Sequence, residues 1–315
     1  MLTYFHPDQS LHHPRTYFSR GRMRMPQEVP ERAARLVAAA FAMGFPVREP
    51  DDFGIAPIAA VHDTHYLRFL ETVYREWKAM PEDWGDEAMS NIFVREPNAL
   101  RGVLAQAARH LADGSCPVGE HTWRAAYWSA QSALAAAAAV RDGAPAAYAL
   151  CRPPGHHARV AVLDTDMHHG QGIQEIFYAR RDVLYVSIHG DPTNFYPAVA
   201  GFDDERGAGE GLGYNVNLPM PHGSSEAAFF ERVDDALREL RRFAPDALVL
   251  SLGFDVYRDD PQSQVAVTTD GFGRLGHLIG ALRLPTVIVQ EGGYHIESLD
   301  ANARSFFGGF GALRG

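Results

Sequence analysis

The sequence predicts an α/β protein with an open, mainly parallel sheet and helices on both faces of that sheet. Short apolar runs of strand character alternate with helical patterns along the chain, as expected when helices connect parallel strands. The runs are almost continuously hydrophobic, which is typical of strands covered on both faces. Chemically distinctive polar residues follow each run, so we expect a site beyond the carboxyl ends of the strands.

The individual elements follow in chain order from these patterns. The predicted strands are Ala146–Cys151, Val160–Leu163, Val183–Ile188, Ala247–Leu252 and Thr286–Val289. Apolar residues also recur at the three- and four-residue spacing of amphipathic helices. The predicted helices are Pro30–Phe41, His65–Trp77, Leu100–Leu111, Ser224–Phe243 and Thr269–Leu282. The uncharged stretch Ala125–Val140 is too short for a membrane span and predicts a buried helix.

The composition limits the classes of function. The 315 residues, 46% hydrophobic and 22% charged, suffice for a single domain over residues 1–315 with a sizeable core. A formal charge of −10 without a basic stripe argues against nucleic acid as a partner. Two cysteines, Cys116 and Cys151, and an N-terminus without a basic-then-apolar pattern predict a cytoplasmic protein without membrane association. The acidic, proline-bearing stretch Met80–Gly119 is predicted to be an insertion.

Metal-ligand residue types follow two of the predicted strands. Asp164, Asp166 and His168 alternate at the end of one strand, so their side chains can converge on one point. Asp255 follows another strand and is the natural further ligand. Carboxylates and an imidazole without a thiolate suit a catalytic zinc site. The alternative is that these side chains only satisfy loop backbone groups.

Further side chains suited to catalysis follow other strands. His156 and His157 come after Arg-Pro-Pro-Gly, a stiff turn that would hold the pair in place. Adjacent imidazoles beside a cation disfavour each other's protonation, which keeps one of them available as a base. Tyr294 follows Glu291-Gly-Gly, where glycine lets the backbone approach a ligand closely. Its phenol can donate a hydrogen bond to an oxyanion.

Taken together, these motifs closely resemble those of the histone deacetylase superfamily. In order they are Pro-Pro-Gly-His156-His157, Asp164-x-Asp166-x-His168-His-Gly, Ser187-Ile-His189, Leu-Gly-x-Asp255 with Asp260-Pro, and Glu291-Gly-Gly-Tyr294. The resemblance runs from about residue 20 to the C-terminus. Within the superfamily the chain is most similar to the bacterial acetylpolyamine amidohydrolases, as Cys151-Arg-Pro-Pro, His189-Gly-Asp-Pro192 and the stretch Met80–Gly119 indicate.

The resemblance implies an arginase/deacetylase-type fold and a zinc-dependent enzyme that hydrolyses the acetyl amide of small acetylated amines. It implies Zn²⁺, with Fe²⁺ as the alternative ion. The implied ligands are Asp166, His168 and Asp255. The implied catalytic residues are His157 as general base and then acid, His156 as its helper oriented by Asp164, and Tyr294 as the oxyanion donor.

The same resemblance implies several supporting positions. A structural potassium ion would lie near Asp164 and Ser187, and an aromatic wall of the substrate tunnel would be formed by Phe195-Tyr196. Arg32 would lie beneath the site. The stretch Met80–Gly119 would help to form a homodimer that narrows the entrance.

Two departures from the family pattern stand out. Gln171 replaces the carboxylate or Asn that commonly supports the base; an amide still forms hydrogen bonds but adds no charge. Between His157 and Val160 the chain also lacks the loop and helix that form the other tunnel wall in the family. Two parallel strands need a crossover of a dozen or more residues. The chain therefore carries a deletion here, or residues are absent from the sequence.

Three functions remain open on this basis. They are deacetylation of acetylpolyamines, deacetylation of lysine in proteins, and non-catalytic binding by a chain with a degraded tunnel. The acidic residues Glu82, Asp83, Asp86 and Glu87 favour a small cationic substrate. An arginase-like ureohydrolase would share the fold, but it would use a dimanganese cluster and would lack the paired histidines and the tyrosine.

Overall fold

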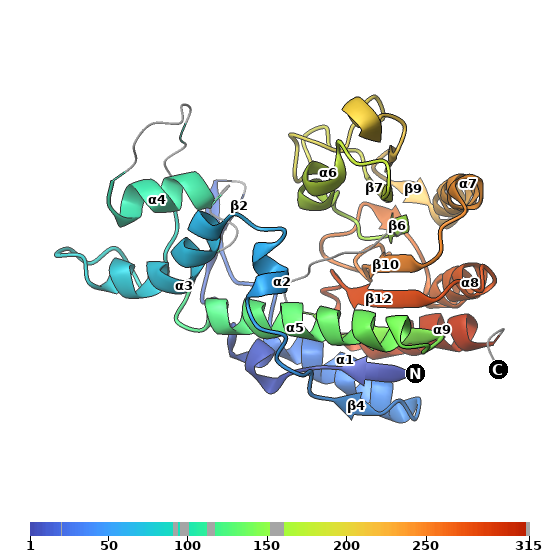
Figure 1. Ribbon diagram of the computed structural model, residues 1–315, viewed down its shortest axis with the longest axis horizontal. Coiled ribbons are helices and arrows are strands. Elements are labelled where there is room, and N and C mark those ends of the chain that lie inside the picture. Colours follow the sequence, from blue (N-terminus) through green and yellow to red (C-terminus); the bar gives the residue numbers. More distant parts are fainter. Residues whose placement is uncertain (20, 91–93, 95–100, 112–116, 152–160, 313–315) are drawn as a thin grey trace.

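An eight-stranded sheet forms the centre of the molecule. The structure is a computed structural model, and it describes residues 1–19, 21–90, 94, 101–111, 117–151 and 161–312. In spatial order the strands are β4 (Val47–Arg48), β1 (Leu2–Tyr4), β5 (Ala146–Ala149), β12 (Thr286–Gln290), β10 (Leu248–Leu252), β6 (Ala161–Asp164), β7 (Leu184–Gly190) and β8 (Asn215–Met220). All neighbouring strands in it are parallel. Figure 1 shows several of them stacked one above another. The predicted open parallel sheet is confirmed.

The five predicted strands lie next to one another in this sheet. They are β5, β12, β10, β6 and β7, and every residue in them is buried. Their continuous hydrophobicity therefore reflects cover on both faces, as predicted. Val160, the first residue of the predicted second strand, lies outside the described residues. Because the strands are parallel and adjacent, their carboxyl ends share one edge of the sheet.

The flanking strands were not predicted. β1 and β4 have only three and two residues, too few to show a period. β8 is an edge strand whose sequence, Asn-Val-Asn-Leu-Pro-Met, mixes amides and a proline with apolar residues. Two small separate sheets were also missed: β2 (Tyr17–Ser19) with β3 (Arg22–Arg24), and β9 (Ser224–Ser225) with β11 (Val265–Ala266).

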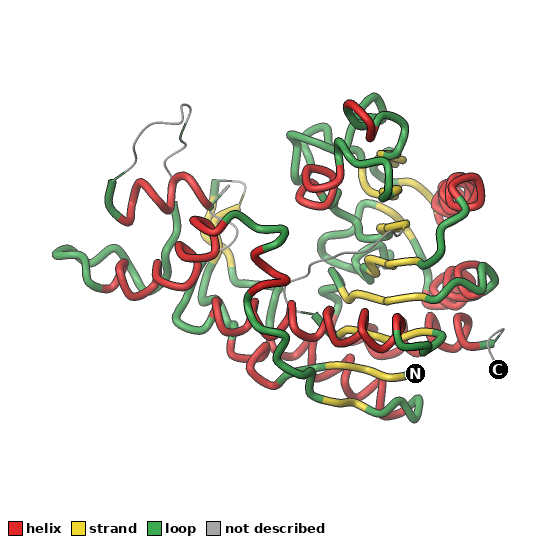
Figure 2. Tube along the Cα trace, viewed as in Figure 1, coloured by secondary structure: helices red, strands yellow, loops and turns green. Residues whose placement is uncertain are grey.

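Helices cover both faces of the sheet (Figure 2). One face packs against α5 (Thr122–Arg141) and α6 (Gln171–Phe177). The other packs against α1 (Pro30–Ala42), α7 (Glu226–Phe243), α8 (Thr269–Gly280) and α9 (Ile296–Gly311). Successive strand residues point to opposite faces, so Val162 belongs to the first cluster and Leu163 to the second.

The predicted helices are found with small differences at their ends, except that Leu100, the first residue predicted for one of them, lies outside the described residues. The buried stretch Ala125–Val140 lies within α5, and the helix predicted from Ser224 begins instead at Glu226. The reason is a cap: Ser225 Oγ accepts a hydrogen bond from Ala228 N at 3.3 Å, which satisfies a free amide of the first turn. The elements α2 (Ala56–Ala59), α6, α9, η1 (Pro7–Leu11) and η2 (Gly209–Gly211) were not predicted.

A smaller helical unit lies to one side of the sheet. Helices α3 (Thr64–Lys78) and α4 (Val103–His110) match two predicted helices and pack together around Phe69, Val73 and Trp77. Figure 1 shows both helices beyond the end of α5 and away from the stacked strands. The described part of Met80–Gly119 belongs to this unit. No helix in the described ranges is long and apolar enough to cross a bilayer.

Candidate metal centre

Three metal-ligand side chains meet beyond the carboxyl ends of two neighbouring strands. Asp166 and His168 follow β6, and Asp255 follows β10, its partner in the sheet. Their candidate ligand atoms all lie within 4.8 Å of one another, and in the part of the chain that the structure describes no other group of His, Cys, Asp and Glu does so. The structure therefore brings together the three residues that the sequence put forward as ligands.

The orientation of these side chains is fixed by their surroundings. His168 Nδ1 lies 3.2 Å from Asp166 Oδ1 and 3.2 Å from Asp255 Oδ2. Backbone amides hold the carboxylates: Met167 N donates to Asp255 Oδ1 at 2.9 Å, and His168 N donates to Asp166 Oδ1 at 2.8 Å. Asp255 Oδ2 is buried without a well-formed hydrogen bond to any described residue. Such an atom is expected to have a further partner.

The three groups are strongly coupled electrostatically. Burial opposes the charge of His168, but hydrogen bonds to Asp166 and Asp255 and their charges outweigh burial and raise its pKa to about 10. Burial, followed by the charge of Asp166, raises the pKa of Asp255 to about 7. A group in which the buried Asp255 carboxyl and the His168 imidazole hold protons this tightly favours added positive charge.

Gly292 allows the loop after β12 to come close to the carboxylates. Its N–H donates to Asp166 Oδ2 at 2.7 Å. A Cβ atom at this position would meet Asp255 Oδ2 and would lie 2.6 Å from Asp166 Oδ2, which is far inside contact distance. Only glycine fits here, and this explains one glycine of the Glu291-Gly-Gly-Tyr294 motif.

Asp164 does not join the ligand group, contrary to the convergence expected from strand alternation. β6 ends at Asp164, so the period of two does not continue to Asp166 and His168. The Asp164 carboxylate instead accepts hydrogen bonds from Tyr185 Oη at 2.9 Å and from Asp166 N at 3.2 Å. Burial, followed by the charge of Asp166, raises its pKa to about 7.

Ser187, the other residue expected near a monovalent cation, lies beside Asp164 as its partner in the β6–β7 pairing. Its Oγ is 2.8 Å from His189 Nδ1, and His189 Nε2 is 2.8 Å from Gly201 O. Since a carbonyl oxygen only accepts, His189 carries its proton on Nε2 and Nδ1 accepts the Ser187 hydroxyl proton. The lone pairs of Ser187 Oγ are therefore left for another donor or a cation.

Glu291 adds a fourth carboxylate to this region, and its role was missed because it appeared only as part of a motif. Burial raises its pKa well above the usual range, and the charges of Asp166, Asp164 and Asp255 raise it further, whereas Arg32 lowers it. The glutamate therefore lies within electrostatic reach of the ligand group. The available signal was its position directly after a buried strand.

Tyr294 is held on the loop that follows Glu291. Arg32 is buried beneath this loop, as expected, and its Nε donates to Gly293 O at 2.6 Å while its Nη2 donates to Glu291 O at 2.6 Å. The guanidinium also lies 4.7 Å from the centre of the Tyr294 ring, a cation–π contact. Burial raises the pKa of the Tyr294 phenol, with Arg32 acting against it, so the phenol stays protonated and able to donate.

The two aromatic residues expected along a tunnel lie beside the ligand histidine. The ring of Phe195 is stacked on that of His168 at 5.2 Å with an interplanar angle of 13°, and the Tyr196 ring meets His168 edge-on at 5.9 Å. Phe195 is buried, whereas Tyr196 is 45% exposed. This pair therefore forms an apolar surface that runs from the ligand group toward solvent.

Two other expectations concern the base. Gln171 opens α6, and its Oε1 is buried without a hydrogen-bond partner among the described residues. The side chain that it was expected to support, His157, lies outside the described residues, as does His156.

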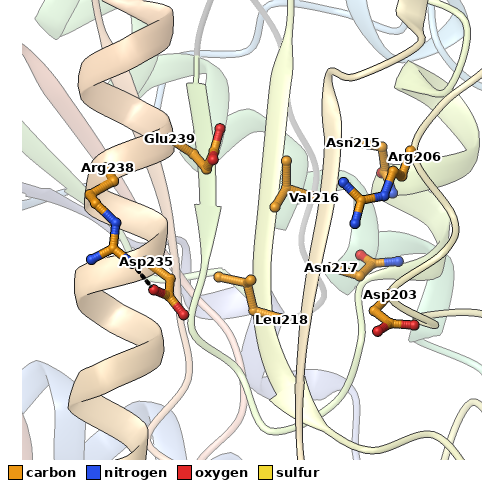
Figure 3. Close-up of a pocket in the computed structure, with 9 residues that line it drawn as sticks. All are labelled: Asp203, Arg206, Asn215, Val216, Asn217, Leu218, Asp235, Arg238 and Glu239. Atoms are coloured by element: carbon orange, nitrogen blue, oxygen red, sulfur yellow. Dashed lines mark hydrogen bonds and ion pairs between the residues drawn. The ribbon is translucent and has the colours of Figure 1, made fainter.

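A pocket of about 230 Å³ opens elsewhere, along the free edge of β8. Figure 3 shows Asp235, Arg238 and Glu239 of α7 on one side and Asp203 and Arg206 on the other. None of the predicted site residues lines it, so it is separate from the candidate metal centre.

The model of the histone deacetylase domain family matches this chain over residues 19–159 and 158–310. The chain is 92% identical over 341 positions to the acetylpolyamine amidohydrolase of Burkholderia pseudomallei, with 100% of both chains covered. It is 38% identical over 351 positions to acetylpolyamine amidohydrolase 1 of Pseudomonas aeruginosa, again with 100% of both covered. A crystal structure of acetylpolyamine aminohydrolase from Burkholderia pseudomallei superimposes with a TM-score of 0.97 at 92% identity, covering 99% of each chain.

These matches bear on the short segment after His157. The alignment to the Burkholderia pseudomallei relative has 341 positions and this chain has 315 residues, so 26 positions of the relative have no residue here. The two segments matched by the family model meet at residues 158 and 159, which indicates that the difference is concentrated beside the His pair. Residues 152–160 lie outside the described part of the chain.

Proposed function

The chain belongs to the histone deacetylase domain family, and we propose that it is a zinc-dependent deacetylase of acetylated polyamines or similar small acetylated amines. The observation that carries the proposal is the meeting of Asp166, His168 and Asp255 at the edge of the sheet, beside the aromatic residues Phe195 and Tyr196. Relatives that match the full length of the chain are described as acetylpolyamine amidohydrolases, which supports the substrate class.

The donor set suits a catalytic divalent ion. Two carboxylates and one imidazole, with no thiolate, match sites in which zinc keeps a position open for water. The buried Asp255 Oδ2 without a well-formed hydrogen bond supports the same assignment. Fe²⁺ would accept these ligands as well, and we propose Zn²⁺ because a deacetylation needs a Lewis acid and no change of oxidation state.

Charge balance supports a second, monovalent cation. Asp164, Asp166, Asp255 and Glu291 interact electrostatically. Among the described residues Arg32 is the positive charge that acts on Glu291, but it also pairs with the Glu28 carboxylate, so negative charge predominates when these carboxyls are ionised and His168 is neutral as a ligand. Because buried charges need compensation, a divalent ion at the ligand group and a potassium ion near Asp164 and Ser187 would balance them.

In the proposed reaction the acetyl C–N bond breaks and water adds to the acyl carbon, giving acetate and the free amine. Bound by its three ligands, the divalent ion would polarise the acetyl carbonyl and acidify a water molecule. His157 would take a proton from that water and later give one to the leaving amine, with His156 as its helper. Tyr294 would donate a hydrogen bond to the oxygen that gains negative charge, and Arg32 would hold the tyrosine loop in place.

The proposed substrate is a small amine carrying a second positive charge. Phe195 and Tyr196 would line the path of its apolar chain. The acidic stretch Met80–Gly119 would contribute to a homodimer and narrow the entrance, and the enzyme would act in the cytoplasm. Lysine deacetylation in proteins is the competing proposal within the same chemistry.

A specific observation favours a second candidate function. Since 26 positions of the Burkholderia pseudomallei relative have no residue here, a chain that keeps the metal site but lacks one tunnel wall would bind a metal and an acetylated amine without turning it over.

The substrate class is tested with two substrates and one inactive control. We expect kcat/KM for N-acetylputrescine to exceed that for an acetyl-lysine peptide at least tenfold, and Asp255→Ala to abolish both activities. A preference for the peptide would favour the lysine deacetylase instead. Binding of N-acetylputrescine without acetate release would favour the non-catalytic protein.

A further inference from the structure

The loop that carries Tyr294 needs restraint from outside because it contains two adjacent glycines. Gly293 adopts a φ of 125°, which other residues rarely adopt. Arg32 restrains the carbonyl groups at the start of the loop, through Glu291 O and Gly293 O. These bonds leave the amides of Tyr294 and His295 to be held by another group.

Asp260 holds those two amides. Its Oδ2 accepts hydrogen bonds from Tyr294 N at 2.6 Å and from His295 N at 2.9 Å. Its other oxygen, Oδ1, accepts from Gln262 N at 2.9 Å. The side chain is 6% exposed, and hydrogen bonds to a carboxylate are roughly twice as strong as those between neutral groups.

Asp260 also connects two parts of the site. It lies on the segment after β10 that carries Asp255, and its own N–H donates to Tyr257 O at 2.9 Å. Phe254 N, on the same segment, donates to Gly292 O at 3.0 Å. The metal-ligand segment and the tyrosine loop are thus joined by backbone at one point and by the Asp260 carboxylate at another.

We propose that Asp260 is a positioning residue for the deacetylation, acting through Tyr294: its carboxylate fixes the backbone of Tyr294 relative to Asp255. The proposal rests on the proposed function. The location of the phenol decides the strength of its hydrogen bond in the transition state, and a misplacement of about 1 Å costs about 10²-fold in rate. Substrate binding along Phe195 and Tyr196 does not depend on this contact.

The test is a double-mutant cycle with Tyr294→Phe. We expect Asp260→Ala to lower kcat about 10²-fold with KM changed less than about threefold. In the Tyr294→Phe background, the same change should lower kcat less than about threefold, because the phenol that it positions is already gone. Asp260→Asn should lower kcat only about tenfold, since its amide oxygen can still accept from Tyr294 N. It also serves as the folding-competent variant if the alanine variant is unstable.

The matched control is Asp259→Asn, which removes the neighbouring exposed carboxylate that pairs with Arg258 at 3.7 Å; its kcat should equal that of the wild type. Equal losses from Asp260→Ala in both backgrounds, or loss of bound zinc, would show a merely structural role and overturn the proposal. Hydrogen exchange supplies a readout that does not depend on activity. The Tyr294 and His295 amides should exchange faster in the Asp260 variants while β12 is unchanged.

The two proposals fail in different ways. A wild-type chain without turnover would refute the proposed function. In that case hydrogen exchange of the Tyr294 and His295 amides would still test whether Asp260 restrains the loop. Unchanged protection in Asp260→Ala would overturn the positioning role whatever the activity.

Discussion

The charge of the ligand group is set by two buried carboxylates that share one imidazole. Asp166 and Asp255 raise the pKa of His168 to about 10 despite its burial. At neutral pH the imidazole therefore holds a proton that a metal ion must displace, and metal binding in such sites releases protons. The same carboxylates that attract a divalent ion make its binding weaker at low pH.

Removal of the Tyr294 hydroxyl should slow the reaction without changing the fold. Tyr294→Phe deletes one hydrogen-bond donor and keeps the ring that lies against Arg32, so the fold and the ligand group should not change. We expect kcat to fall about 10²- to 10³-fold, the usual cost of losing an oxyanion donor, with zinc content unchanged. Steady-state kinetics and elemental analysis of both proteins measure this. Near-wild-type kcat would remove Tyr294 from the mechanism.

Individual site residues were predictable where residue type alone limits the chemistry. Asp166, His168 and Asp255 offer metal-ligand atoms at strand ends, and the structure brings them together. Asp260 was visible only as part of an Asp-Pro motif, because nothing in the sequence shows that its carboxylate accepts from Tyr294 N. Contacts made by backbone amides of a distant loop leave no pattern in the residue types.

At the scale of elements, two buried histidines form a polar layer between β7 and the start of α6. His189, on β7, and His169, just before α6, are 1% and 3% exposed, and their rings lie 4.7 Å apart. Burial lowers the pKa of His169 to about 4. Burial also lowers the pKa of His189 to about 3, with a further contribution from the charge that His169 would carry if protonated. Both histidines are therefore neutral in the folded protein at neutral pH.

This layer predicts a loss of stability in acid. Below about pH 6.5 each histidine binds a proton in the unfolded chain but not in the folded protein. Each therefore lowers the free energy of unfolding by about 1.4 kcal/mol for every pH unit that the pH falls. For His169 the loss continues down to pH about 4. Asp164 and Asp255 have pKa values raised to about 7, so their protonation stabilises the folded protein as the pH falls. The pH dependence of the wild-type stability alone therefore does not isolate the histidines.

The measurement is therefore a difference between proteins. Urea unfolding of the wild type and of His169→Gln between about pH 7 and pH 4.5 should show the stability of the wild type falling relative to the variant. His277→Gln, at an exposed position on α8, is the control and should keep a constant difference. A constant difference for His169→Gln as well would contradict the neutral, buried state of that histidine.

Elements were predictable to the extent that burial fixes their sequence. The five central strands are covered on both faces and so had to be apolar. β8 could not be found in this way, because it lies at the edge of the sheet and uses Asn215 and Asn217 to bind Gln174 Oε1, both at 2.9 Å. The short strands β1 and β4 are determined by their pairing with neighbouring strands and not by a hydrophobic pattern of their own.

At the scale of the whole molecule, the helical unit of α3 and α4 carries the acidic stretch proposed to recognise a cationic substrate. Asp86 forms ion pairs with Arg15 and Lys78, and the Glu87 carboxylate accepts a hydrogen bond from Arg15 N at 3.1 Å. These two residues therefore help to hold the N-terminal segment. Glu82 and Asp83 are exposed and are the better probes of substrate attraction.

The corresponding prediction concerns selectivity and assembly. Glu82→Gln with Asp83→Asn should raise KM for N-acetylputrescine a few-fold and leave KM for a neutral acetyl amide of equal length unchanged, with the difference shrinking at high salt. Glu231→Gln with Asp234→Asn makes the same charge change at exposed positions on α7 and should have no effect. Sedimentation should show a two-fold dimer. Equal effects on both substrates, or an active monomer, would contradict the proposal.

The connection between β5 and β6 is the least typical feature of the whole molecule. β12 and β10 lie between these two strands, and all four are parallel. Between residues 149 and 161 the chain must therefore cross three strand spacings, about 14 Å, and also return from the carboxyl end of β5 to the amino end of β6. The sequence supplies eleven residues, 150–160, between the two strands, fewer than the dozen or more that a crossover between parallel strands needs. The sequence predicted this shortage, and the 26 unmatched positions of the Burkholderia pseudomallei relative give its size.

Whether this 315-residue chain is a metal-dependent deacetylase is decided by measuring the acetate that it releases. The chain is stripped with a chelator, titrated with Zn²⁺ and assayed on N-acetylputrescine, with Asp255→Ala in parallel. We expect no acetate from the stripped chain, activity that rises until one zinc is bound at Asp166, His168 and Asp255, and none from the variant. One equivalent of bound zinc with no acetate above the Asp255→Ala level would contradict this expectation.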